Sequence, residues 1–128
     1  MASNTKSRII LTDRAQRSVN RAWNRFADIY GNKIGKAPIV KINARLKTTA
    51  GRAWINDGII DLSLSLYDEF KDQFESNTIP HECAHFVAYR VFNEANHGRA
   101  WKDVMVAYGI EPAVYHDYLE QRMIRKFK

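Results

Sequence analysis

The sequence predicts an α+β domain in which an N-terminal helix, a small three-stranded sheet and a buried helix are followed by C-terminal helices. Apolar residues recur at helical spacing between residues 12 and 30, alternation and turn residues fill residues 39–62, and an almost wholly apolar run covers residues 79–92. The chain has 128 residues, 45% of them hydrophobic, which suits one globular unit with a single core. We therefore expect residues 1–128 to form one domain, with residues 1–8 as a flexible lead.

The first expected helix begins at Thr12 or Asp13, because either side chain can cap a helix, and it ends near Tyr30, before Gly31 and Asn32. Its apolar face consists of five residues at spacings of three and four: Ala15, Val19, Ala22, Phe26 and Ile29. This spacing predicts that one side of the helix packs on the core.

The opposite face of this helix carries a stripe of four arginines, Arg14, Arg17, Arg21 and Arg25. They fall within an arc of roughly 80° when each residue advances the helix by about 100°. A ladder of guanidinium groups can follow a phosphate backbone, so the stripe is a candidate nucleic-acid surface. The alternative is an ordinary solvated face, which Asp28 on the same side would dilute.

Three short strands are expected next. Ile39–Asn43 alternates in part, Thr48–Asn56 is the second candidate, with Gly51 as a candidate bulge, and Ile59–Leu62 returns as the third. Asn56-Asp57-Gly58 is a hairpin-turn signal between the last two strands, because these residue types tolerate positive φ. The pattern predicts a small sheet ahead of the apolar run.

Helical signals follow the strands and return near the end of the chain. Ser63 or Ser65 can start a helix that runs through Phe74. Near the end of the chain, Gly109 ends a helix and Pro112 can start another. These signals complete the predicted α+β order.

The apolar run contains the most informative pattern, His81-Glu82-Cys83-Ala84-His85. On a helix, His81 and His85 lie one turn apart on one face, close enough to hold a single metal ion. Glu82 would project beside the metal, where it can take a proton from a metal-bound water. This is the H-E-x-x-H arrangement of zinc peptidases. Cys83 would point away from the metal, so we interpret it as a small core residue.

A catalytic zinc site needs a third protein ligand and leaves the fourth position open. His97 is the first candidate, because Asn93, Asn96 and Gly98 supply turn chemistry that can bring the chain back toward the helix. Glu94 is the alternative, since two histidines and a glutamate also form catalytic zinc sites. Either set predicts one zinc ion per chain.

Several segments together resemble the SprT-like family, whose eukaryotic relatives are the Spartan proteases. They cover roughly residues 39–108 in the family's order: Thr48-Thr49-Ala50-Gly51-Arg52-Ala53, Ile59-Ile60-Asp61-Leu62-Ser63, His81-Glu82-Cys83-Ala84-His85 and His97-Gly98-Arg99-Ala100-Trp101-Lys102-Asp103-Val104-Met105. The resemblance implies a minimal zincin-like metallopeptidase core, with His81, His85 and His97 as zinc ligands and Glu82 as general base. Many family members carry a four-cysteine zinc ribbon, whereas this sequence has a single cysteine.

Composition bears on partners and compartment. The net charge is +6 and the pI about 9.6, and a basic stretch closes the chain at Arg122, Arg125, Lys126 and Lys128. A basic balance favours an acidic partner such as DNA, bound single-stranded or nonspecifically, although positive charge also serves solubility alone. No apolar run approaches the ~20 residues of a membrane span. We expect a cytoplasmic monomer that associates with the nucleoid if it binds DNA.

The function that these residues predict is a zinc-dependent metalloendopeptidase acting on proteins held on DNA, as in the repair of DNA–protein crosslinks that the resemblance implies. The substrate would add a strand at the edge formed by Thr49–Asn56 or Ile59–Leu62, near Trp54. Four residues are candidates for oxyanion stabilisation: Arg99, Tyr108, Tyr115 and His116. The alternatives are a non-catalytic zinc module associated with DNA and a peptidase with no nucleic-acid role.

Overall fold

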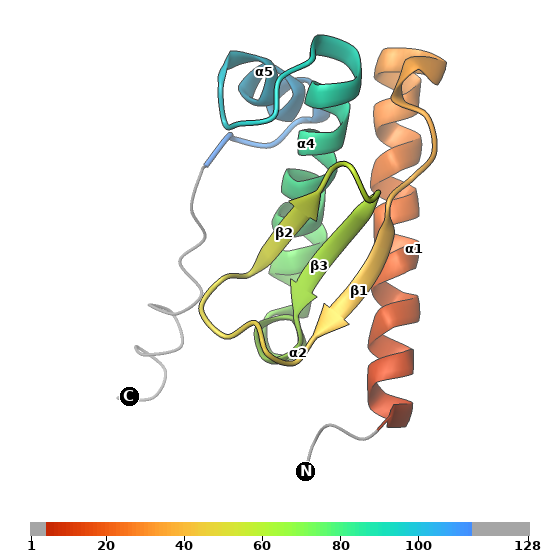
Figure 1. Cartoon of the computed structure of the whole chain (residues 1–128), viewed down its shortest axis with the longest axis vertical. Coiled ribbons are helices and arrows are strands. Elements are labelled where there is room, and N and C mark those ends of the chain that lie inside the picture. Colours follow the sequence, from red (N-terminus) through yellow and green to blue (C-terminus); the bar gives the residue numbers. More distant parts are fainter. Residues whose placement is uncertain (1–4, 114–128) are drawn as a thin grey trace.

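A three-stranded sheet backed by helices forms the protein in our computed structural model, which describes residues 5–113 (Figure 1). The strands are β1 (Ile39–Asn43), β2 (Gly51–Trp54) and β3 (Ile59–Ser63), in the order β1-β3-β2. Strand β3 is parallel to β1 and antiparallel to β2. The α+β prediction is confirmed. Within the described part of the chain, none of the helices has the length and apolarity that crossing a membrane requires.

Helix α1 (Thr5–Tyr30) begins earlier than the sequence predicted. Thr12 does not cap it: its hydroxyl donates to the Arg8 carbonyl oxygen one turn back, at 2.7 Å. The Arg8 guanidinium donates to the Ile42 carbonyl oxygen on β1 at 2.9 Å, so residues 5–8, expected in a flexible lead, form helix instead. No glycine or proline interrupts this stretch, and Leu11 extends the buried face toward the N-terminus.

The apolar face of α1 packs against β1 and α4. Ala15, Val19, Ala22 and Phe26 are buried as predicted, whereas Ile29 is 42% exposed. Trp23 is buried in addition, and its ring N–H donates to the Gly35 carbonyl oxygen at 2.9 Å.

The strand order shows that one of the two edges predicted for strand addition is wrong. Both sides of β3 are occupied, by β1 and by β2, so Ile59–Leu62 has no edge to offer an added strand. Strand β2 is shorter than the Thr48–Asn56 candidate and lies at the edge of the sheet. The predicted turn is present, with Gly58 at φ +69°, where side chains other than glycine are strained.

Four helical segments lead from the sheet into the motif. Of the two expected starts, Ser63 is the cap: its hydroxyl accepts from the Leu66 amide at 3.2 Å. The segments are α2 (Leu64–Glu69), α3 (Lys71–Gln73), a π-helical turn η2 (Phe74–Thr78) and α4 (Ile79–Phe92). Helix α4 has the predicted bounds, and its first ten residues are all buried.

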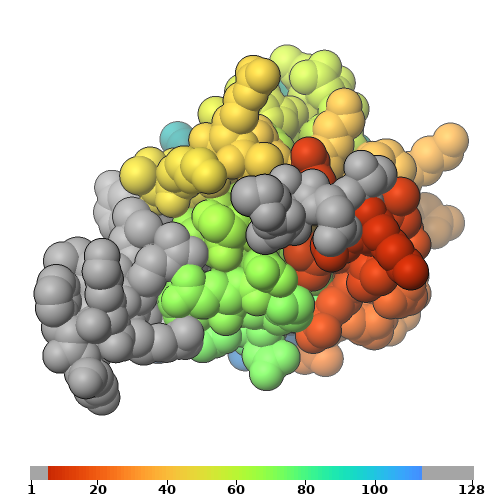
Figure 2. All heavy atoms as spheres, turned by 90° about the horizontal axis from the view of Figure 1, so that it is seen from below, coloured from red at the N-terminus to blue at the C-terminus, as the bar shows by residue number. Residues whose placement is uncertain are grey.

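A charged cluster ties α1 to the turn that precedes α4. Arg14 Nε and Nη2 donate to the two carboxylate oxygens of Glu75 at 2.6 and 2.9 Å, and the Tyr67 hydroxyl donates to Glu75 at 2.8 Å. Seen from below, the lower half of α1 lies against the residues that lead into α4 (Figure 2). The Arg14 guanidinium holds the pKa of Glu75 below its usual value.

Replacing Glu75 with glutamine should lower the free energy of unfolding at pH 7 by about 1–3 kcal/mol, because the hydrogen-bonded ion pair with Arg14 is lost and the hydrogen bond from the fully buried Tyr67 loses its charged acceptor. The pKa of Glu75 is lowered on folding, so its contribution is present above the unfolded pKa and disappears as pH falls through the folded pKa. The difference between the two proteins in urea unfolding should therefore shrink below about pH 4.5.

Asp68→Asn is the matched control, because its ion pair with Lys71 joins side chains that are 64% and 34% exposed. This variant should change stability by less than about 0.5 kcal/mol. An equal loss in the Asp68 and Glu75 variants would contradict a special role for the cluster.

Candidate metal centre

The first turns of α4 bury three polar side chains of the motif. His81, Glu82 and His85 are 3%, 4% and 8% exposed. Pro80 lies in the opening turn of the helix, where its missing N–H costs nothing and its fixed φ suits the helix. Because His81 and His85 lie one turn apart, both rings point from the same face, as predicted.

The loop after α4 brings His97 back to this face. Asn93 ends the helix in the left-handed conformation, at φ 57°, and turns the chain around. Glu94 Oε1 then accepts from the amides of Ala100 at 2.8 Å and Trp101 at 3.2 Å, in the first turn of α5 (Arg99–Tyr108). The Glu94 carboxylate thus caps α5, and it is His97 that lies with the α4 histidines.

Gly98 leaves room for neighbouring side chains in the loop between α4 and α5. A Cβ atom there would lie 2.6 Å from Asn96 Oδ1 and 2.8 Å from the Glu94 carboxyl carbon, closer than real contacts allow. The Asn96 side chain also accepts from the Gly98 amide at 2.9 Å. A side chain at this position would therefore push the Asn96 and Glu94 side chains away from the backbone amides that they accept from.

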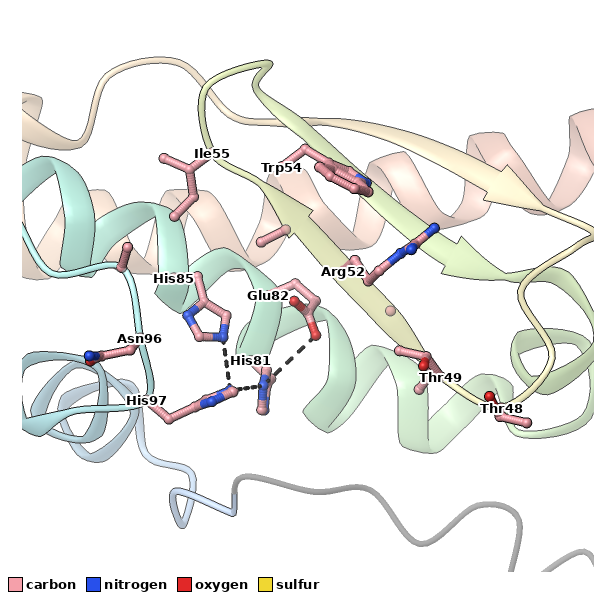
Figure 3. A pocket seen from close by; sticks show the side chains of 14 residues that line it. Thr48, Thr49, Arg52, Trp54, Ile55, His81, Glu82, His85, Asn96 and His97 are labelled. Atoms are coloured by element: carbon pink, nitrogen blue, oxygen red, sulfur yellow. Dashed lines mark hydrogen bonds and ion pairs between the residues drawn. The ribbon is translucent and has the colours of Figure 1, made fainter.

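The three histidines converge (Figure 3). His97 Nε2 lies 3.1 Å from His81 Nε2 and 3.0 Å from His85 Nε2. Two nitrogens bound to one tetrahedral zinc ion lie about 3.3 Å apart, given Zn–N bonds of about 2.0–2.1 Å. Within residues 5–113, these histidines are the one group of three or more His, Cys, Asp or Glu side chains that could hold a metal ion. Their spacing fits such an ion.

Trp101 supports the histidines from behind. Its ring is fully buried, stacks on His85 with centroids 5.5 Å apart, and lies 4.7 and 4.6 Å from the rings of His81 and His97. Its ring N–H donates to the His81 carbonyl oxygen at 3.2 Å. Sequence reasoning predicted a core tryptophan but not its contact with all three rings, since α5 meets α4 only in the folded chain.

Burial sets the protonation of the centre. It lowers the pKa of His85 to about 4, with a further contribution from His97, so the imidazole is neutral at pH 7, as a metal ligand must be. Burial raises the pKa of Glu82 to about 8. A cation held by the histidines would favour the ionised carboxylate, whose Oε2 lies 3.8 Å from His81 Nε2.

The centre opens into a cleft of about 550 Å³ between β2 and α4. Gly51 lies close to both neighbouring elements: a Cβ there would lie 3.0 Å from Leu62 Cδ2 on β3, a tight contact, and 3.5 Å from Glu82 Cγ on α4, an ordinary one. Trp54 also lines the cleft and is 45% exposed. The carboxylate and the three histidines therefore face a space that a substrate could enter.

Strand β2 presents its free edge to this cleft. The Ser63 amide donates to the Ala50 carbonyl oxygen at 2.9 Å, which makes these two residues a hydrogen-bonded pair. Hydrogen-bonded and non-bonded pairs alternate in an antiparallel ladder. In the observed register, the backbone groups of Gly51 and Ala53 therefore point away from β3. They form an edge that an added strand could use.

The arginine stripe is divided by the fold. Arg14 is paired with Glu75, and Arg25 Nε donates to the Tyr108 carbonyl oxygen at 2.8 Å with its guanidinium 4.9 Å from the Tyr108 ring centre. Arg17 and Arg21 are exposed. The sequence could not show this division, because both partners come from distant parts of the chain.

The remaining candidates lie away from the centre or outside the described residues. Cys83 is fully buried, and burial raises the pKa of its thiol. Arg99 is largely exposed beside Asp103, and Tyr108 packs on Phe26; neither lines the cleft. The other predictions concern residues outside 5–113: Tyr115, His116, the helix expected after Pro112 and the basic residues Arg122, Arg125, Lys126 and Lys128.

Comparison with known proteins identifies relatives. Protein SprT of Pseudomonas syringae pv. tomato is 31% identical over 99 residues, which cover 75% of this chain and 60% of the relative. Protein SprT of Pseudomonas entomophila is 35% identical over 78 residues, 59% of this chain and 48% of the relative. The chain thus spans about half to three-fifths of the length of these relatives. No solved structure matches the chain significantly.

The sequence profile of the SprT-like family matches residues 18–116. This match covers most of the chain and includes all three clustered histidines. The chain therefore belongs to the SprT-like family.

Proposed function

We propose that this chain is a zinc-dependent endopeptidase in which His81, His85 and His97 hold the metal and Glu82 is the general base. One observation carries the proposal: three imidazole nitrogens converge beside a buried carboxylate in an open cleft. A structural zinc site is closed by a fourth protein ligand. Among residues 5–113, no fourth His, Cys, Asp or Glu joins the three histidines as a ligand, which favours a catalytic site.

When bound, zinc would lower the pKa of a water molecule and polarise the carbonyl of the bond to be cut. Glu82 accepts the proton of the attacking water at Oε2 and returns it to the leaving amine. Its side chain is almost fully buried, so bulk water does not compete for that proton. The Trp101 ring and the α4 backbone keep the histidine rings oriented during the reaction.

The substrate lies along β2 as an extended strand. The outward-facing backbone groups of Gly51 and Ala53 support this proposal, since they are the hydrogen-bonding groups that strand addition requires. Such pairing holds the polypeptide by its main chain and positions a peptide bond over the histidines.

We also propose that the protein substrates are held on DNA. The net charge of +6 supports an acidic partner. Arg17 and Arg21 remain exposed on α1, one turn apart, and can contact neighbouring phosphates. Arg14 and Arg25 contribute less, because their guanidinium groups are engaged within the fold.

Purified protein should bind about one equivalent of zinc. His97→Ala should weaken zinc binding by more than about 100-fold, because losing a residue that only supports a ligand already weakens metal binding by up to about 100-fold. Metal titration against a chelating indicator measures both. Glu94→Gln is the control, because it keeps the oxygen that caps α5 and should retain zinc. Zinc retained by the His97 variant and lost by the Glu94 variant would show that Glu94 is the third ligand.

Glu82→Gln should keep zinc and fold but lower the rate of casein cleavage by about 10²–10⁴, the usual cost of removing a general base. Cleavage is followed by the release of labelled peptides, with zinc content measured on the same samples. Glu111→Gln, at an exposed position outside the cleft, should cleave like the unaltered protein. Full activity in the Glu82 variant would remove this residue from the mechanism.

The double variant Arg17→Gln, Arg21→Gln should bind single-stranded DNA more weakly at low salt and leave zinc content unchanged. If each arginine contacts one phosphate, the slope of log affinity against log salt should fall by about 1.4. Arg99→Gln removes a largely exposed cation elsewhere and serves as the control. Equal salt slopes in the double variant and the unaltered protein would contradict the proposed contacts.

A further inference from the structure

We infer that the cleft continues into a specificity subsite beside Tyr89 that takes a large apolar or aromatic side chain of an extended polypeptide. The inference rests on the proposed peptidase function and adds the class of substrate. A second hollow of about 420 Å³ adjoins the metal-centre cleft and shares four lining residues with it: Ala53, Trp54, Ile55 and Ala95. Asn56, Asp57 and Tyr89 complete its walls.

Tyr89 is placed by the same helical geometry as the histidines. His81, His85 and Tyr89 follow one another at intervals of four, so their side chains lie along one face of α4. The helix is buried through Ala88, whereas Tyr89 is 38% exposed. The ring lines the hollow and remains accessible to a ligand.

The opposite wall comes from β2 and the turn after it. Side chains alternate along a strand, so Gly51, Ala53 and Ile55 lie on the side that faces α4. Ile55 points from the turn toward the side of the cleft where His85 lies (Figure 3). A substrate strand paired with β2 would point alternate side chains the same way. The one beyond Ala53 would enter the hollow, close to the bond over the histidines.

The lining decides which side chain fits. The side chains of Ala53, Ile55, Tyr89 and Ala95 form the apolar part of the walls, and the polar residues Asn56 and Asp57 are exposed at the turn. A lysine or arginine could reach Asp57, but an exposed carboxylate is screened by water and salt. Removing an apolar side chain from water between Tyr89 and Ile55 is the stronger interaction.

This chemistry constrains the substrate protein. Large apolar and aromatic side chains are mostly buried in folded proteins, so they reach a narrow cleft only when the chain around them is unfolded or extended. The same condition applies to the main chain, which must pair with the β2 edge. The subsite therefore selects unfolded segments over folded domains.

The test measures binding separately from cleavage. Zinc-loaded Glu82→Gln protein is titrated with three peptides that differ at one position, which carries phenylalanine, alanine or lysine. We expect the phenylalanine peptide to bind at least about tenfold more tightly than the other two. Tenfold is the lower end of the discrimination that an apolar pocket provides. Adding Tyr89→Ala should remove this preference, whereas Tyr89→Phe should keep it.

Phe92→Ala is the matched control. Phe92 is also on α4 and 52% exposed, but it packs edge-on against Tyr30, away from the hollow. This variant should keep the preference. Ile55→Asn alters the opposite wall at a turn position and should remove it even if Tyr89→Ala fails to fold.

Three results would overturn the subsite. The three peptides could bind equally, the lysine peptide could bind more tightly, or the phenylalanine preference could survive both Tyr89→Ala and Ile55→Asn. Cleavage of the same peptides by the unaltered protein is assayed in parallel. Absence of cleavage with an intact phenylalanine preference would count against the peptidase proposal and support the subsite. Cleavage of the peptides without a phenylalanine preference in binding would support the peptidase proposal and count against the subsite.

Discussion

The structure depends on one constraint: a helix buried on nearly every side must accommodate two histidines and a glutamate. Burying polar groups is costly unless they find partners, and at the start of α4 the partners are one another, His97 and the Trp101 ring. Apolar residues around the rest of α4 fix the helix in the core, so the imidazoles have little freedom to turn away. The same burial that makes these groups expensive to fold keeps His85 neutral and ready to act as a ligand.

The loop between α4 and α5 completes this arrangement with few residues. Asn93 reverses the chain, Glu94 caps the next helix, and Gly98 leaves room for the Glu94 and Asn96 side chains. Glu94 could have been a ligand by residue type, yet capping α5 uses its carboxylate and anchors the helix that carries Trp101. One short segment thus delivers the third histidine and fixes the ring that packs behind all three.

Charge on α1 serves two purposes that composition alone cannot separate. Arg14 turns inward to Glu75 and Tyr67 and secures the π-helical turn that leads directly into α4. Arg25 contacts the end of α5, so two arginines of the stripe hold together the elements around the histidine cluster. Arg17 and Arg21 remain exposed. A basic face can therefore be partly structural, and the number of arginines on it overstates the charge available for binding.

Features that depend on nearby residues could be predicted from the order of the amino acids alone. The bounds of α4, the first strand, the turn at Gly58 and the shared face of His81 and His85 follow from helical or strand periodicity and from backbone preferences, which act over a few residues. Tertiary structure decided the rest. The central position of β3, the clustering of His97 with His81 and His85, the pairing of Arg14 and the hollow at Tyr89 depend on contacts between segments far apart in the chain. Periodicity cannot specify such contacts, because they exist only once the core has brought those segments together.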